Sequence, residues 1–174
     1  VLVNSDVALP EFDYVALGHI HRHQILNNEN PMMVYSGSLQ RIDFGEEKDQ
    51  KGFCVIDLDA TKPYGTRLQN FTFQPVNARN FLTINVDISA NDNDPTASVI
   101  KVISEHEVEN AIVRIKIKLP GELEKHLKDR EIRDALSDAH FIASISKDIL
   151  EIEEMKLAHD YTKGLEPKEA LKLY

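Results

Sequence analysis

The sequence of 174 residues has little cysteine and no long apolar run. A single cysteine, Cys54, excludes a framework of internal disulfides and fits a reducing setting such as the cytoplasm. Because it lies in the apolar segment 52–57, Cys54 is expected to be a buried thiol rather than a nucleophile. No apolar run approaches the roughly 20 residues of a membrane span, and the N-terminus has no signal-peptide pattern. We therefore expect a soluble, cytoplasmic protein without a membrane partner.

The sequence also lacks an excess of basic residues. Its 20 Lys and Arg are outnumbered by 29 Asp and Glu, which gives a formal net charge of −9. This balance argues against a generally basic nucleic-acid-binding surface, although a local basic patch is compatible with an acidic protein. The length allows one ordinary domain or two small ones. The first residue is Val1 rather than Met, which suggests a fragment or a processed piece.

Short strands joined by turns are expected in the first 80 residues. Apolar runs predict them at 13–17, 24–26, 32–35, 53–58 and 67–73. Because these strands follow one another with tight connections, antiparallel pairing is expected. The intervening segment 41–51 is strongly charged and contains a glycine, so we expect it to be a solvated loop.

After residue 80 the pattern becomes strand, helix, strand, helix, strand. Alternating apolar residues predict strands at 81–88 and 111–119, and an apolar run predicts the last strand at 141–145. Asp94 before a proline predicts the start of the first helix, and Asp129 is a plausible N-cap for the second. Two helices covering one face of a three-stranded sheet make a compact α+β unit.

A Gly-His-Ile-His motif directly follows the first predicted strand. If this segment is extended, His19 and His21 point to the same side with roughly 7 Å between their Cα atoms. That spacing suits two metal ions about 3.5 to 4 Å apart, each ring reaching a different ion. The alternative is a pair of polar loop histidines beside a turn. The position after a buried strand and Gly18 favours the metal site.

The segments DYVALGHIHRHQ, VYSGSLQR and KGFCVIDLD resemble the calcineurin-like metallophosphoesterases. They are most similar to the SbcD group of DNA repair nuclease subunits, kin to the eukaryotic and archaeal double-strand-break nuclease. This resemblance extends over essentially the whole chain and implies an α+β architecture in three parts. They are the C-terminal strands of a metallophosphoesterase β-sandwich (1–80), a three-stranded, two-helix capping domain (81–152), and a linker with the start of an ATPase-binding tail (153–174).

The same resemblance implies that His19 and His21 each ligate one of two Mn²⁺ (or Mg²⁺) ions in a DNA exonuclease and endonuclease. The other ligands of the family belong to an Asp-x-His, a Gly-Asp and an Asn-His-Asp motif and a further histidine, which come earlier in its sequence and are absent here. Two imidazoles without bridging carboxylates cannot hold a pair of divalent ions. We therefore expect this chain alone to bind no metal stably, to hold no catalytic residue and to have no nuclease activity.

The family also implies DNA and an SbcC-type ATPase as partners, and a homodimer of the intact protein. Small polar residues after the third strand and a nearby arginine are candidates for DNA contact, with simple turn chemistry as the alternative for the serines: Ser36, Ser38 and Arg41. His23 stands where relatives of this type often have proline and is expected to be an exposed loop residue.

Two further groups of candidates lie in the second half of the chain. Basic residues on the open sheet face are candidates for DNA contact, with a solvated face that also carries Asp87 as the alternative: Arg114, Lys116 and Lys118. An apolar stripe in a terminal helix supplies candidates for partner binding: Leu165, Leu171 and Tyr174.

Two other functions stay open at this point. One is a phosphatase or nucleotide phosphodiesterase with the same histidine motif. The other is a non-enzymatic module in which residues 81–174 hold DNA or a protein partner and the histidines are incidental.

Overall fold

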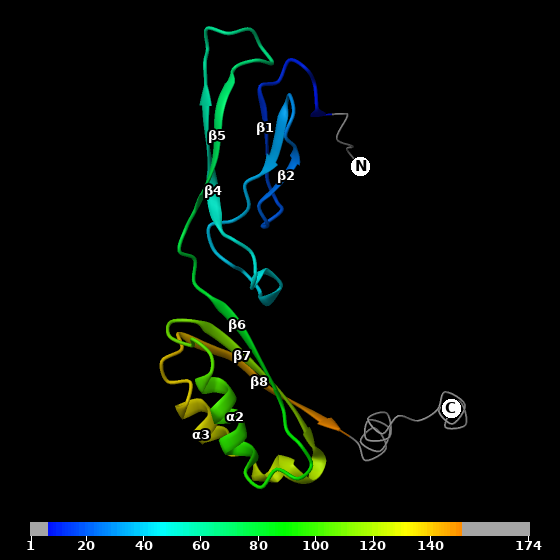
Figure 1. The fold of residues 1–174 in the computed structure, drawn as a ribbon, viewed down its shortest axis with the longest axis vertical. Helices are drawn as coiled ribbons and strands as arrows, with labels where there is room; N and C mark the ends of the chain where they lie inside the picture. The colour runs from blue at the N-terminus through cyan, green and yellow to red at the C-terminus, as the bar shows by residue number, and fades with distance from the viewer. Residues whose placement is uncertain (1–6, 151–174) are drawn as a thin grey trace, which may run out of the picture. The chain divides into compact units, whose positions relative to one another are not determined.

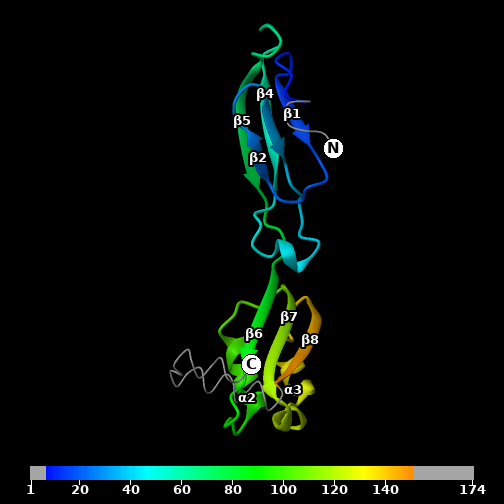
Figure 2. The same ribbon diagram turned by 90° about the vertical axis from the view of Figure 1, so that its right-hand side faces the viewer.

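A computed structural model describes residues 7–150 of the chain. The chain divides into two compact units with the boundary between Phe81 and Leu82. We call the part before this boundary unit 1 and the part after it unit 2, and each is described by itself (Figures 1 and 2). No helix within the described range is long and apolar enough to span a membrane. The predicted tail at 153–174 lies outside this range, with its partner-binding candidates Leu165, Leu171 and Tyr174.

Unit 1 contains two small sheets. The first has the strand order β1-β3-β2 and is formed by β1 (Tyr14–Leu17), β2 (Gln24–Asn27) and β3 (Met32–Tyr35). The second is a hairpin of β4 (Gly52–Leu58) and β5 (Leu68–Pro75). All five strands lie where the apolar runs predict them.

The pairing in unit 1 differs from the prediction for one strand. The pairs β2–β3 and β4–β5 are antiparallel, as expected. The expectation is wrong for β1, which pairs with β3 in parallel. The reason is that β3 lies between β1 and β2 in the sheet. The chain leaves β1 through the irregular segment 18–23 and forms β2 on the other side of β3.

Aromatic contacts join the two sheets of unit 1. The ring of Tyr14 on β1 lies 6.2 Å from that of Phe71 on β5, centroid to centroid. His23 stacks on Phe73 at 4.0 Å, and its Nδ1 lies 3.0 Å from the carbonyl oxygen of Tyr35. His23 lies in a loop as expected, but the expectation that it is exposed is wrong, because its ring packs on a phenyl ring and bonds the main chain.

Unit 2 is a three-stranded sheet with two helices on one side (Figures 1 and 2). Its strands, in the order β6-β7-β8, are β6 (Phe81–Asp87), β7 (Ile112–Pro120) and β8 (Phe141–Leu150). The helices are α2 (Pro95–Ser104) and α3 (Asp129–Asp134), and a 3₁₀ helix, η2 (Gly121–His126), follows β7. β7 and β8 pair in parallel, with α3 in the connection between them. The α+β class is confirmed.

The alternation along β7 sets which face of this sheet is buried. The side chains toward the helices are 0% exposed: Ala111, Val113, Ile115, Ile117 and Leu119. They form one apolar cluster with Ile84 and Val86 of β6 and with Val99 and Ile132 of the two helices. The residues between them on β7 therefore lie on the open face, as the period of two requires.

The helix starts agree only in part with the sequence. Asp94 caps α2 as predicted, since its carboxylate accepts a hydrogen bond of 3.0 Å from a backbone N–H of the first turn. The prediction for α3 is wrong, because its N-cap is Lys128, whose side chain makes no capping bond. Asp129 instead pairs with Lys147 on β8 at 3.1 Å. The helix ends at Asp134.

Candidate functional site

The histidine motif forms an irregular loop after β1 rather than an extended segment. His19 adopts a φ of +77°, a left-handed conformation that is uncommon for residues other than glycine. Both His19 and His21 are exposed. The expectation of an extended chain is therefore wrong at His19, where the backbone bends between the two rings.

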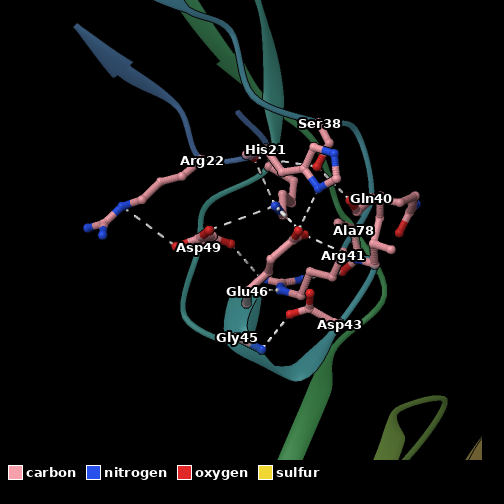
Figure 3. A network of polar contacts seen from close by, with 12 residues as sticks. His21, Arg22, Ser38, Gln40, Arg41, Asp43, Gly45, Glu46, Asp49 and Ala78 are labelled. Carbon is pink, nitrogen blue, oxygen red and sulfur yellow. Dashed lines mark hydrogen bonds and ion pairs between the residues drawn. The ribbon is translucent and has the colours of Figure 1, made fainter. Parts of the chain in front are cut away.

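His21 is held at both its ring and its main chain (Figure 3). Its Nδ1 lies 2.7 Å from Oε1 of Glu46. Its carbonyl oxygen accepts hydrogen bonds from Nζ of Lys51 at 3.0 Å and from the backbone N–H of Ser38 at 3.1 Å. The orientation of this side chain is thus set by residues 17 to 30 positions later in the sequence.

Glu46 and Lys51 form a buried ion pair beneath the histidine loop. The two charged atoms lie 2.7 Å apart, and the Lys51 side chain is 0% exposed. The second contact of Glu46 Oε2 is the backbone N–H of Ile42 at 3.1 Å. Burial opposes the charge on Glu46, but the hydrogen bonds from Lys51, His21 and that N–H prevail and lower its pKa to about 2.

The expectation of a solvated loop at 41–51 is wrong for these positions. The segment contains a 3₁₀ turn, η1 (Phe44–Glu46), and buries Glu46 and Lys51, while Asp43 and Lys48 are exposed. Sequence reasoning missed Glu46 and Lys51, because a charged loop is normally solvated and their spacing matches no ligand motif. The turn could have been predicted locally, because an aspartate two residues before a glycine is a common turn pattern. In the structure the Asp43 carboxylate accepts a hydrogen bond from the N–H of Gly45.

Arg41 fastens this loop to the last residues before unit 2. Its guanidinium donates to the carbonyl oxygens of Glu46 and Asp49 in the loop and of Ala78 and Arg79 beyond β5, at 3.0 to 3.2 Å. Four bonds occupy most of the five N–H donors of an arginine. For the DNA contact predicted from the sequence, Arg41 therefore has one N–H group that is not used in these four bonds.

Ser36 and Ser38, the serines expected to approach DNA, flank Gly37, and it is this glycine that lies against the backbone of the histidine loop. Gly37 has a φ of +82°, and a Cβ there would lie 2.8 Å from the backbone nitrogen of His23 and 3.0 Å from the carbonyl oxygen of His21. Ser38 Oγ donates to the Gln40 carbonyl at 2.7 Å, and Ser36 Oγ to that of Gly37 at 3.4 Å. A side chain at position 37 would push the two segments apart.

The predicted basic face of unit 2 is a separate feature. Lys116 and Lys118 are exposed and line a shallow hollow that also includes Asp87 and Asp148. Arg114 is half-buried, and its Nε donates to the Thr83 hydroxyl at 2.8 Å. The face is therefore mixed in charge rather than uniformly basic.

Comparisons with known proteins find partial matches to metallophosphoesterases and DNA repair proteins. No protein-family model matches the chain. It is 38% identical over 65 residues to the SbcD component of the SbcCD nuclease of Staphylococcus epidermidis, which is 37% of this chain and 16% of that protein. It is 38% identical over 55 residues to the metallophosphoesterase YhaO of Bacillus subtilis, a match that covers 32% of this chain and 13% of YhaO. It is 39% identical over 54 residues to the DNA double-strand break repair protein Mre11 of Methanocaldococcus jannaschii, a match that covers 29% of this chain and 15% of that protein.

Over this part of its length the chain is SbcD/Mre11-like. The resemblance drawn from the sequence motifs is thereby confirmed for 29 to 37% of the chain, and its extension to the remainder stays a prediction. The matched part is 13 to 16% of the length of these relatives.

The donors of this SbcD/Mre11-like chain suit a divalent metal in type but not in number. Imidazole is a common ligand of Zn²⁺ and other transition metals. Within residues 7–150, Nε2 of His21 has no hydrogen-bond partner, which leaves one nitrogen able to ligate. In the same range no three His, Cys, Asp or Glu side chains gather closely enough to hold an ion. Among the described residues, the histidine loop therefore offers single imidazole donors and no complete metal site.

Replacing Lys51 by Met should destabilise unit 1 by about 3–5 kcal/mol, because it leaves the Glu46 carboxylate buried without its counter-ion. The measurement is the free energy of amide exchange in β1 and β3, which reports this unit separately. Replacing Glu46 by Leu in the same chain should recover part of the loss. The control is Lys48→Met at an exposed position of the same loop, expected to change stability by less than about 0.5 kcal/mol. Equal effects of the two Lys→Met changes would contradict the ion pair.

Proposed function

We propose that this chain is the C-terminal portion of an SbcD-type, Mn²⁺-dependent DNA nuclease that works in double-strand-break repair with an SbcC-type ATPase. The observation that carries the proposal is His21, presented at the end of β1 with its Nδ1 bonded and its Nε2 open, in a chain similar to SbcD and Mre11. By this proposal unit 1 is the end of the metallophosphoesterase domain and unit 2 the capping domain, in a cytoplasmic homodimer.

In this reaction His19 and His21 would each hold one of two ions, with the carboxylate, amide and remaining histidine ligands supplied upstream of Val1. A divalent ion held there supplies a Lewis acid for the phosphodiester and lowers the pKa of water. The residues of this chain contribute the orientation of a ligand: Glu46 and Lys51 hold His21, and Gly37 admits the main chain that supports it.

DNA and ATPase contacts complete the proposal. Lys116 and Lys118 are the best placed of the DNA-contact candidates, because both are exposed on the open face of the sheet. For Ser38 and Arg41, support of the histidine loop is the better-supported role, since the Ser38 N–H bonds the His21 carbonyl and Arg41 bonds the Glu46 carbonyl. The Ser36 hydroxyl bonds the carbonyl of the neighbouring Gly37. The ATPase contact is assigned to the tail residues Leu165, Leu171 and Tyr174 on the sequence pattern alone.

In the intact protein, His21→Ala should lower the rate of Mn²⁺-dependent cleavage of double-stranded DNA at least about 100-fold, because a ligand of the metal pair is lost. The matched control is His140→Ala, an exposed histidine of unit 2, which should cleave at the wild-type rate. The purified 174-residue chain should not cleave DNA at all. Cleavage by that chain, or full activity of His21→Ala, would contradict the proposal. Hydrolysis of small phosphodiesters without DNA cleavage would favour the phosphodiesterase alternative.

Charge reversal of the three basic residues of β7 should weaken DNA binding by the intact protein and flatten its salt dependence. If all three touch phosphates, the slope of log K against log salt should shrink by about 3, since each contact contributes about 0.9. The measurement is DNA affinity across a series of salt concentrations for the triple variant with these changes: Arg114→Glu, Lys116→Glu and Lys118→Glu.

The control for this variant carries the same change in net charge on the helices of unit 2. Its exposed positions lie on α2, η2 and α3: Lys101→Glu, Lys125→Glu and Arg130→Glu. An equal loss of affinity in both triple variants would assign the effect to net charge and reject a specific role for the open face.

A further inference from the structure

Among the residues that the structure describes, the ring of His21 has a hydrogen-bond partner on one nitrogen, and that partner fixes where the proton sits. Oε2 of Glu46 already accepts from Lys51 at 2.7 Å and from the Ile42 N–H at 3.1 Å. A carboxylate paired with an ammonium group is an acceptor at both oxygens. Oε1 therefore accepts from Nδ1 of His21, which must carry a proton, so that in the neutral ring the lone pair lies on Nε2.

The same ion pair also fixes the main chain at this residue. Nζ of Lys51 donates both to Glu46 and to the carbonyl oxygen of His21, so one buried ammonium group holds the ring through the carboxylate and the backbone directly. The His21 side chain itself is 44% exposed. An exposed ring on a buried, charged support is the arrangement of a ligand held for something outside the chain.

His23, two residues later, shows what a purely structural histidine looks like in this unit. Its Nδ1 bonds a neutral backbone carbonyl, and its ring is stacked on Phe73 at 4.0 Å. His21 has no such ring contact within the described residues, and its partner carries a full negative charge. A charged acceptor on Nδ1 makes Nε2 a stronger electron-pair donor, as in carboxylate–histidine–metal arrangements.

We propose that Glu46, held in place by Lys51, is a positioning residue that fixes the tautomer and orientation of His21 so that Nε2 faces the metal. The inference rests on the proposed function for the identity of what Nε2 meets, and it adds two residues to the machinery of that site. Neither Glu46 nor Lys51 touches a metal or substrate in this role; they act through His21.

The test is the protonation of the ring nitrogens, read by ¹⁵N NMR of the 174-residue chain at about pH 8.5, above the ordinary pKa of histidine, without metal or DNA. In the wild type, the His21 proton should sit on Nδ1, and in Glu46→Gln that preference should be lost in favour of Nε2. His23 is the internal reference and should keep its proton on Nδ1 in both proteins. Asp49→Asn removes a carboxylate that lies 3.9 Å from Nζ of Lys51 and does not bond the His21 ring, and it should leave both rings unchanged.

A wild-type His21 that carries its proton on Nε2, or a Glu46→Gln ring that keeps it on Nδ1, would overturn the proposal. If Glu46→Gln disturbs His23 as well, Glu46→Asp replaces it, since this change keeps the charge and withdraws the carboxylate by one methylene. In that case the proposal is overturned if the wild-type His21 carries its proton on Nε2 or if the Glu46→Asp ring keeps it on Nδ1.

A second readout separates this inference from the proposed function. In the intact protein, Glu46→Gln should weaken Mn²⁺ binding about 10- to 100-fold, and Asp49→Asn should not. Wild-type affinity in Glu46→Gln would overturn the positioning role. If the NMR result holds while His21→Ala remains an active nuclease, the proposed function fails and the tautomer assignment stands.

Discussion

The ion pair between Lys51 and Glu46 is the interaction on which the candidate site depends. Taking both charges out of water is unfavourable, and their attraction offsets this only when the remaining donors and acceptors are also bonded. Here they are: the carboxylate takes three hydrogen bonds, and the ammonium group also bonds the His21 carbonyl. A pair of this kind is a poor way to gain stability alone, but it fixes one geometry. What it fixes is an exposed imidazole.

The rest of unit 1 brings the pieces of this arrangement together. β1 delivers the chain to the histidine loop, and Gly37 after β3 lets a second segment approach that loop at backbone distance. Arg41 then closes the charged segment over the pair by binding four carbonyl oxygens. Unit 2 needs none of this, because its sheet and helices bury a continuous apolar cluster of their own. Unit 1 thus combines aromatic contacts between its sheets with a buried polar network around His21, whereas unit 2 is organised by apolar packing.

This difference explains what could be predicted from the sequence. The strands and the α2 cap of unit 2 follow from local rules: alternation along β7, and a carboxylate one residue before Pro95. The Gly-His-Ile-His motif could also be recognised from the sequence, because it is a local pattern of consecutive residues. The pairing of β1 with β3 and the burial of Glu46 could not be predicted, since both depend on contacts between segments far apart in the sequence. A charged stretch such as 41–51 is normally solvated, and here the tertiary contacts of Arg41, Glu46 and Lys51 reverse that.

The central claim is that His21 is a metal ligand through Nε2 while Glu46 holds Nδ1. Anomalous diffraction at the manganese edge, from crystals of the intact protein grown with Mn²⁺, tests it most directly. We expect an anomalous peak about 2.0–2.3 Å from Nε2 of His21, with the contact between Nδ1 and Glu46 retained. A peak bound to Nδ1, or manganese sites that leave His21 without a metal, would contradict the claim.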